Sequence, residues 1–87
     1  MKYDLTSSFI KDVKKSPLEI QAQVKALIGS IEAAERLSDL QHVKKMKGFS
    51  DAYRIRLGEY RVGILMRENL VILARILHRR EVYRYFP

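Results

Sequence analysis

The sequence predicts an α+β domain in which a hairpin of two helices covers one face of a mostly antiparallel, four-stranded sheet. Apolar and polar residues alternate in residues 2–6 and 53–66, as in strands, and apolar residues fill 70–77 almost completely. Between the first two of these segments, apolar residues recur at the spacing of a helix. The resulting order, β-α-α-β-β-β, is typical of a small sheet with helices on one side. With 87 residues, 47% of them hydrophobic, the chain can form one core. We therefore expect a single domain over residues 1–87.

Two helices are expected in the first half of the chain. Ser7 or Ser8 is placed to cap the first helix. Ser16 and Pro17 mark the start of the second, with serine as the N-cap and proline at the first helical position. Apolar residues then recur every three or four positions as far as about residue 37. The two helices are expected to lie on the sheet through their apolar sides.

The strongest local signal is a β-hairpin formed by residues 53–57 and 60–66. Gly58 and Glu59 separate the two strands and fit a two-residue type II′ turn, which has glycine first. A turn of this length fixes the strand register. The expected cross-strand pairs are Leu57 with Tyr60, Arg56 with Arg61, Ile55 with Val62, and Arg54 with Gly63.

The register brings three arginines together on one face of the hairpin. Arg56 directly opposes Arg61, and Arg54 lies one diagonal step away. Like charges across a strand pair are destabilising, so packing gives no reason for this arrangement. A bound anion would remove the repulsion, and the cluster therefore predicts an anion-binding surface.

A connector and a buried strand flank the hairpin. The connector covers residues 38–48 and carries three lysines, Lys44, Lys45 and Lys47. The last strand is apolar nearly throughout, as a strand covered on both faces would be. Arg75 interrupts this strand, and a charge is not expected beneath the helices. We therefore expect Arg75 on the face that the helices leave open, together with Val71, Leu73 and Leu77.

The charge distribution points to a polyanionic partner. The net charge is +7, and all of it falls after residue 42, because the first 42 residues carry equal numbers of acidic and basic groups. Nucleic acid is the expected partner ahead of a membrane, since no basic amphipathic helix is evident. The sequence has no cysteine, which fits the reducing environment of the cytoplasm. Its two histidines and scattered acids predict neither a metal site nor another cofactor.

Three interpretations fit arginines beside lysine, histidine and tyrosine. The cluster is a solvated surface, a phosphate-binding site with Tyr83 or Tyr85 stacking on bases, or the centre of a metal-independent ribonuclease. In the last case a ribose 2′-hydroxyl attacks the neighbouring phosphate and a base takes its proton. His78 follows the last strand and precedes Arg79 and Arg80, which makes it a candidate for that base.

Three segments resemble the RelE/ParE superfamily of bacterial and archaeal toxins, most closely its RelE branch. They are residues 46–48 (Met-Lys-Gly), 53–62 (Tyr-Arg-Ile-Arg-Leu-Gly-Glu-Tyr-Arg-Val) and 78–83 (His-Arg-Arg-Glu-Val-Tyr). The resemblance implies a toxin of a type II toxin–antitoxin pair. RelE members enter the ribosomal A site and cut the mRNA there, whereas ParE members inhibit DNA gyrase.

The resemblance also implies a set of site residues. The expected catalytic residues are Arg54, Arg56, Arg61, His78, Arg80 and Tyr83, with Arg79 as an alternative to Arg80 and Tyr85 as an alternative to Tyr83. Further contacts to RNA are expected from Lys44, Lys45, Lys47, Arg75, Arg79, Arg84 and Tyr85. Well-known relatives carry lysines at positions 54 and 56. Because arginine stays protonated and is a poor base, His78 is the expected substitute in proton abstraction.

The expected partners follow from the same resemblance. They are the ribosome with its mRNA and a cognate antitoxin that covers the open face of the sheet, and no membrane is expected. The toxin alone would be monomeric and would form oligomers through its antitoxin. The expected location of the protein is the cytoplasm. Two alternatives stay open: a gyrase inhibitor of the ParE kind, and a basic module that binds nucleic acid without cutting it.

Overall fold

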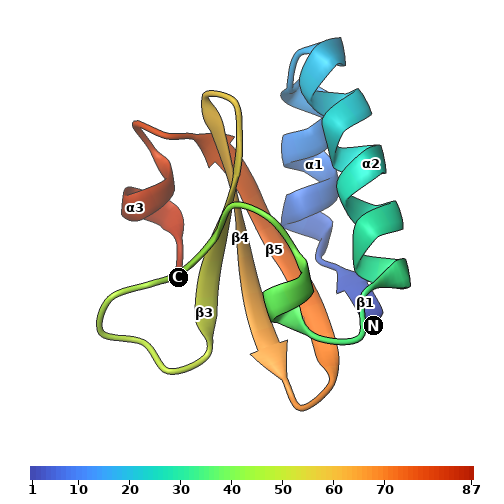
Figure 1. Ribbon diagram of the computed structural model, residues 1–87. Helices are drawn as coiled ribbons and strands as arrows, with labels where there is room; N and C mark the ends of the chain where they lie inside the picture. The colour runs from blue at the N-terminus through green and yellow to red at the C-terminus, as the bar shows by residue number, and fades with distance from the viewer.

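A computed structural model describes residues 1–87 and confirms the predicted α+β class. The strands are β1 (Lys2–Leu5), β2 (Val43–Lys45), β3 (Ala52–Leu57), β4 (Tyr60–Arg67) and β5 (Leu70–His78), and the helices are α1 (Ser7–Lys15), α2 (Leu18–Ala33) and α3 (Val82–Tyr85), with a 3-10 turn at Leu37–Asp39. The sheet order is β1-β5-β4-β3-β2, and only the β1–β5 pair is parallel. Helices α1 and α2 lie on one side of the sheet and α3 on the other (Figure 1).

The sheet has five strands where the sequence predicted four. The additional strand is β2, which falls in the predicted connector and pairs antiparallel with β3, placing Lys44 opposite Arg54. Three residues are too few for a visible alternation, so this strand depends on its pairing with β3 and not on a local pattern.

The predicted hairpin register is confirmed. Leu57 faces Tyr60, Arg56 faces Arg61 and Ile55 faces Val62. Gly58 has φ +58° while Glu59 has a negative φ, as a type II′ turn requires.

A β-bulge at Ala74 changes which face the side chains of β5 occupy. Gly63 pairs with Arg75, but the next residue, Ile64, pairs with Leu73, which leaves Ala74 without a partner. The alternation of side chains therefore reverses at this position.

The bulge corrects one prediction about the open face, which we define as the face away from α1 and α2. Val71 and Leu73 were expected on that face, but both are fully buried in the core beneath the helices. Of the three residues expected on the open face, only Leu77 packs against the apolar cluster there. The prediction was wrong for Val71 and Leu73 because strict alternation along one strand does not reveal an extra residue.

The helix boundaries also differ from those predicted. Thr6, not Ser7 or Ser8, caps α1, and its Oγ1 accepts the Phe9 N–H at 3.0 Å. Helix α2 begins at Leu18 after Pro17 and ends at Ala33, before residue 37. Pro17, expected at the first helical position, is the N-cap residue instead of Ser16, and the Ser16 hydroxyl donates to the Asp12 carbonyl at 2.8 Å. A hydroxyl can bond to neighbouring carbonyls as well as to a helix start, and the sequence does not distinguish the two.

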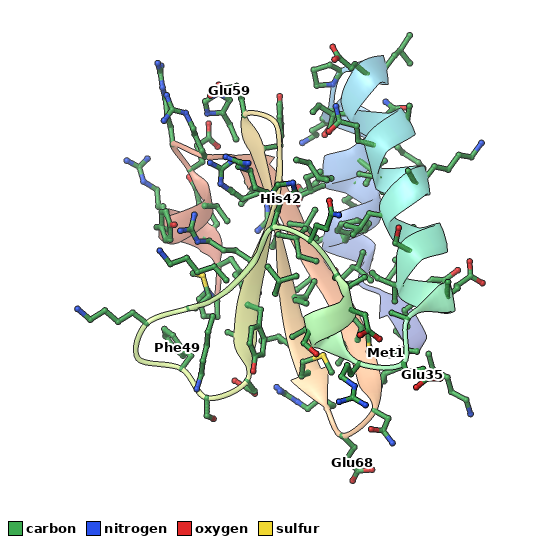
Figure 2. All side chains as sticks on the ribbon, viewed as in Figure 1. Met1, Glu35, His42, Phe49, Glu59 and Glu68 are labelled. Carbon is green, nitrogen blue, oxygen red and sulfur yellow. The ribbon has the colours of Figure 1, made fainter.

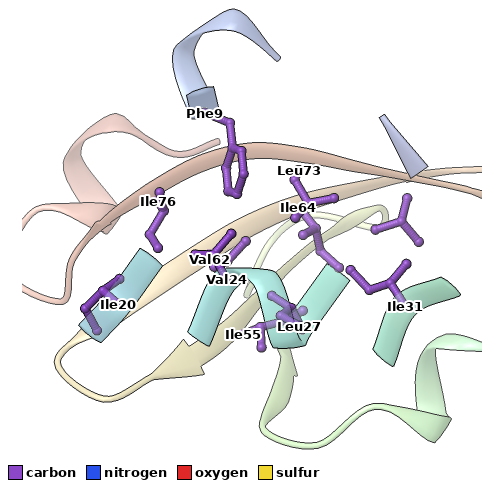
Figure 3. Close-up of a cluster of buried hydrophobic side chains, with 11 residues drawn as sticks. Phe9, Ile20, Val24, Leu27, Ile31, Ile55, Val62, Ile64, Leu73 and Ile76 are labelled. Atoms are coloured by element: carbon purple, nitrogen blue, oxygen red, sulfur yellow. The ribbon is translucent and has the colours of Figure 1, made fainter. Parts of the chain in front are cut away.

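The main core fills the space between α1, α2 and the sheet (Figure 3). Its buried residues are Phe9, Ile20, Val24, Leu27, Ile31, Ile55, Val62, Ile64, Val71, Leu73 and Ile76. The burial of these large side chains is the principal contribution to stability. No helix of the structure combines the length and the hydropathy that crossing a membrane requires.

A second, smaller cluster holds α3 on the open face. It consists of Met46, Ala52, Val82 and Phe86. The Phe86 ring lies over Gly63, where a Cβ atom would come within 2.5 Å of it, so the ring fills the space that glycine leaves free. This contact fixes the C-terminal segment beside the arginines of the hairpin.

Candidate anion-binding site

The open face carries a cationic hollow above β2, β3 and β4. Side chains from three strands meet here because Lys44 pairs with Arg54, and Arg56 pairs with Arg61. The hollow has a volume of about 320 Å³ and is lined by His42, Val43, Lys44, Arg54, Arg56 and Arg61. Figure 2 shows His42 at this place, with nitrogen-bearing side chains beside it. We call these six residues the arginine hollow.

No carboxylate neutralises the arginine hollow. The chain forms three ion pairs, which are Arg67 with Asp51, Arg75 with Asp12, and Arg79 with Glu59. None of them includes Lys44, Arg54, Arg56 or Arg61. Four cations therefore share one hollow without a partner of opposite charge, an arrangement that favours a bound anion.

Arg61 is the most constrained cation of the hollow. Its Nη1 donates to the carbonyls of Gly58 at 2.8 Å and Tyr60 at 2.9 Å, while its Nε is buried without a partner. Burial, followed by the charges of Arg54 and Arg56, lowers the pKa of Arg61 from its ordinary value. A phosphate bound nearby would oppose both effects, because it supplies the opposite charge that the site lacks.

Tyr83 extends the hollow with an aromatic surface. The ring lies on α3, and the Arg54 guanidinium carbon is 5.5 Å from its centroid, within the range of a cation–π contact. Val82, its neighbour, is fully buried and anchors the helix, whereas Tyr83 is 59% exposed. Its ring is therefore available for stacking on an unpaired base.

His42 joins the arginines, although the sequence did not single it out for this role. Its Nδ1 lies 3.3 Å from Nη2 of Arg56. A guanidinium can only donate, so Nδ1 accepts this bond and the imidazole hydrogen is on Nε2. His42 precedes β2 and has φ +62°. Since β2 itself was not predicted, the sequence offered no signal for this placement.

His78 is not brought together with the arginines. It pairs with Tyr60, whose side chain is on the helix-covered face, opposite to that of Arg61. The two rings meet edge to face with centroids 5.6 Å apart. The backbone N–H of Arg80 donates to Nδ1 of His78 at 3.2 Å.

Two of the predicted phosphate ligands have carboxylate partners. Arg75 donates from Nε to Asp12 at 2.7 Å, and this hydrogen bond raises the pKa of Arg75. Arg79 pairs with Glu59 at 2.6 Å.

The remaining predicted ligands have no ionic partner. Arg80 and Arg84 are exposed on the C-terminal segment, and Lys47 is in the loop after β2. Lys45 is also exposed, but it pairs with Tyr53 and so alternates away from Lys44. Tyr85 lies under Arg75, with the guanidinium carbon 5.8 Å from its ring centroid.

Comparisons with known proteins show which proteins this chain resembles. Residues 3–83 match the family described as the ParE toxin of the type II toxin–antitoxin system, parDE. The chain is similar to Toxin RelE3 of Methanocaldococcus jannaschii, with 40% identity over 88 residues and full coverage of both chains.

Two solved structures have the same fold. A chain of the RelB–RelE antitoxin–toxin complex from Methanococcus jannaschii superposes with a TM-score of 0.82 and 38% identity, covering 95% of this chain and 98% of that one. The intact E. coli RelBE toxin–antitoxin complex contains a chain with a TM-score of 0.67 and 19% identity, at coverages of 86% and 92%.

Proposed function

This chain belongs to the RelE/ParE toxin superfamily, and we propose that it is a RelE-like toxin that cleaves mRNA on the ribosome. In the proposed reaction the ribose 2′-hydroxyl attacks the adjacent phosphate and the 5′-oxygen leaves. The nucleophile belongs to the substrate, so the protein has to supply position, charge and proton transfer but no cofactor. The reaction would take place in the cytoplasm, where ribosomes and mRNA meet.

The arginine hollow is the observation that carries the proposal. A phosphate under attack gains negative charge, and fixed cations stabilise that charge most strongly when nothing else neutralises them. Arg54, Arg56 and Arg61 meet this condition because none has a carboxylate partner. The exposed ring of Tyr83 beside Arg54 adds a stacking surface for a base next to the cut.

We assign roles according to these contacts. Arg61 would hold the scissile phosphate together with Arg80, which has no carboxylate partner, in preference to Arg79, which is paired with Glu59. Arg54 and Arg56 would bind the phosphates on either side. Lys44, Lys47 and Arg84 would add contacts to the RNA around them, whereas Lys45 alternates away from the hollow.

A cognate antitoxin is the proposed inhibitor. The similar archaeal toxin was solved in a complex of RelB with RelE. An antitoxin segment with carboxylates and apolar residues would neutralise the arginine hollow and cover Leu77 and its neighbours on the open face. In that case the free toxin would be a monomer, and larger assemblies would form through the antitoxin.

The family match also favours a second candidate, inhibition of DNA gyrase, because the matching family is described as the ParE toxin. Such an inhibitor would act by docking and would need no cleavage centre. A gyrase supercoiling assay with the purified toxin separates the two functions. A third possibility, a module that binds RNA without cutting it, would show salt-dependent binding and intact RNA.

The proposed function is tested by incubating the toxin with ribosomes programmed with a defined mRNA. We expect a cut in the A-site codon, and no cut when the nucleotide that supplies the attacking hydroxyl carries a 2′-deoxy sugar. Cleavage of the deoxy substrate would exclude the 2′-hydroxyl mechanism. Inhibition of supercoiling without any RNA cleavage would assign the chain to the gyrase inhibitors.

A further inference from the structure

The arginine hollow contains one side chain suited to accept a proton near neutral pH. Attack by a 2′-hydroxyl requires a base, and the three guanidiniums stay protonated in this range. Lysine side chains in general titrate near pH 10, whereas imidazoles titrate near neutrality. His42 is the only imidazole that lines the hollow.

From this geometry we infer that His42 is the proton acceptor in the proposed RNA cleavage, an inference that rests on the proposed function. Two contacts with the same strand position hold it in place. The backbone N–H of Arg56 donates to the His42 carbonyl at 3.2 Å, and the Arg56 side chain reaches Nδ1 at 3.3 Å. The backbone bond fixes the residue beside β3, and the side-chain bond directs Nδ1 of the imidazole toward the Arg56 guanidinium.

The contact with Arg56 indicates how the base becomes available. The Arg56 guanidinium binds a phosphate more strongly than it binds a neutral imidazole, because its hydrogen bond to the phosphate is charge-assisted. When the RNA enters, Arg56 turns to a phosphate oxygen and leaves the Nδ1 lone pair of His42 free. Substrate binding itself would then release the base.

The step balances in protons and bonds without a cofactor. The 2′-hydroxyl proton passes to Nδ1 of His42, and the 2′-oxygen forms a bond to phosphorus. The bond between phosphorus and the 5′-oxygen breaks, and that oxygen takes a proton from solvent. The products are a 2′,3′-cyclic phosphate and a 5′-hydroxyl, and His42⁺ returns its proton to water.

The other histidine is less well placed for this role. His78 is directed to the helix-covered face, where its ring contacts Tyr60, and its Nδ1 already accepts the Arg80 N–H. The two candidate bases therefore predict different cleavage rates for the His42→Ala and His78→Ala variants, which can be measured side by side.

The experiment is single-turnover cleavage of mRNA on programmed ribosomes by His42→Ala, with Gln41→Ala as the neighbouring control and His78→Ala as the competing candidate. We expect His42→Ala to lower the rate by about 10²–10⁴-fold while ribosome binding and Tm stay unchanged. Added imidazole should restore part of the lost rate. Gln41→Ala should cleave like the wild type.

The pH profile supplies a second readout. The wild-type rate should rise with pH and then level off, as in any reaction that needs a deprotonated base, and His42→Ala should lose this dependence. Five other charged groups line the cavities that His42 shares: Asp39, Lys44, Arg54, Arg56 and Arg61.

Distinct outcomes overturn the inference and the proposed function. If His42→Ala cleaves at the full rate while Arg61→Ala does not, His42 is not the base, but the proposed function stands. The inference also fails if His78→Ala alone is slow and rescued by imidazole, or if His42→Ala is slow only because binding or Tm falls. A wild-type protein that cuts no ribosome-bound mRNA overturns both.

Discussion

Arg61 and Arg75 lie on the same face of the same sheet, yet their surroundings are opposite. The Asp12 carboxylate accepts hydrogen bonds from Arg75 Nε at 2.7 Å and Arg75 Nη2 at 3.2 Å. This hydrogen bonding raises the pKa of Arg75. Arg61 has no carboxylate partner, and its pKa is lowered by burial and by the charges of two neighbouring arginines. The Asp12–Arg75 pair fastens α1 to β5, whereas Arg61 belongs to a site that lacks its counter-ion.

The comparison separates structural cations from functional ones. A charge that stabilises a fold is paired within the fold, as Arg75 is, because an unpaired half-buried charge costs free energy. A charge that binds a ligand stays unpaired until the ligand arrives. Asp12 also accepts the Ile76 N–H at 3.1 Å, so one carboxylate satisfies both the side chain and the backbone beside the bulge. No residue does the same for Arg61.

Among the variants that test this comparison, Arg61→Ala is expected to have the largest effect, and that effect is on catalysis. Removing one cation that stabilises developing charge costs about 3–4 kcal/mol, which lowers the cleavage rate roughly 10²–10³-fold. Tm should change little, because the loss of bonds to two carbonyls is offset by relief of the repulsion with Arg54 and Arg56. Rate measurements and a thermal melt test both parts.

Arg67→Ala is the matched control for this variant, since Arg67 is an exposed arginine of β4 paired with Asp51. It should keep the wild-type rate. A large fall in Tm for Arg61→Ala would show that Arg61 is structural and would remove the contrast with Arg75.

Asp12→Ala should have the opposite profile. It leaves the Arg75 guanidinium and the Ile76 N–H without their acceptor, and we expect a loss of about 2–3 kcal/mol in the free energy of unfolding. For a domain of this size the loss corresponds to a fall in Tm of roughly 10–20 °C. The cleavage rate of the folded fraction should stay close to that of the wild type.

Asp4→Ala, at an exposed acid of β1, is the matched control for Asp12→Ala and should melt like the wild type. A stable Asp12→Ala variant with impaired cleavage would place Asp12 in the functional site.

The sequence revealed the unpaired arginines better than the paired one. A two-residue turn determines the register of its hairpin, so Arg54, Arg56 and Arg61 could be placed from local rules alone. Arg75 was correctly expected to avoid the helix core, but its partner Asp12 is 63 residues away in the sequence and meets it only after the helix has docked. Such contacts depend on the whole fold.

The same limit explains what the sequence could not show in the site. The bulge at Ala74 adjusts β5 to its neighbour, and it reversed the expected faces of Val71 and Leu73. His42 reaches Arg56 because β2 pairs with β3, which no local alternation indicated. The cations of the site were therefore predictable, and the histidine among them was not.

Gly63 lies between the two regions and offers a way to perturb both. It pairs with Arg54 on one side and Arg75 on the other, and the Phe86 ring covers it. In Gly63→Ala the new methyl group would overlap that ring, so α3 has to shift, at a cost of about 1–3 kcal/mol. We expect a lower Tm together with weaker RNA binding, because Tyr83 moves with α3.

Gly29→Ala is the control, since nothing lies within 4 Å of the position where a Cβ at Gly29 would be placed. It should stabilise the helix by about 1 kcal/mol at most. An unchanged Gly63→Ala protein would mean that Phe86 leaves the sheet freely.

The smallest expected effects distinguish the two tyrosines of α3, each of which contacts one of the two regions. Tyr83 lies by Arg54 in the arginine hollow, and Tyr85 lies by Arg75. Tyr83→Ala should weaken RNA binding by about 1–3 kcal/mol, the contribution of one stacked base, with little change in Tm. Tyr85→Ala removes a cation–π contact from a charge that is already paired, so it should cost about 0.5–1 kcal/mol of stability and leave RNA affinity near that of the wild type.

Binding titrations and melts of the two variants form a single comparison. If Tyr85→Ala weakened RNA binding as much as Tyr83→Ala, the RNA would extend past the hollow to Arg75, and the Asp12–Arg75 pair would border the binding site instead of lying outside it.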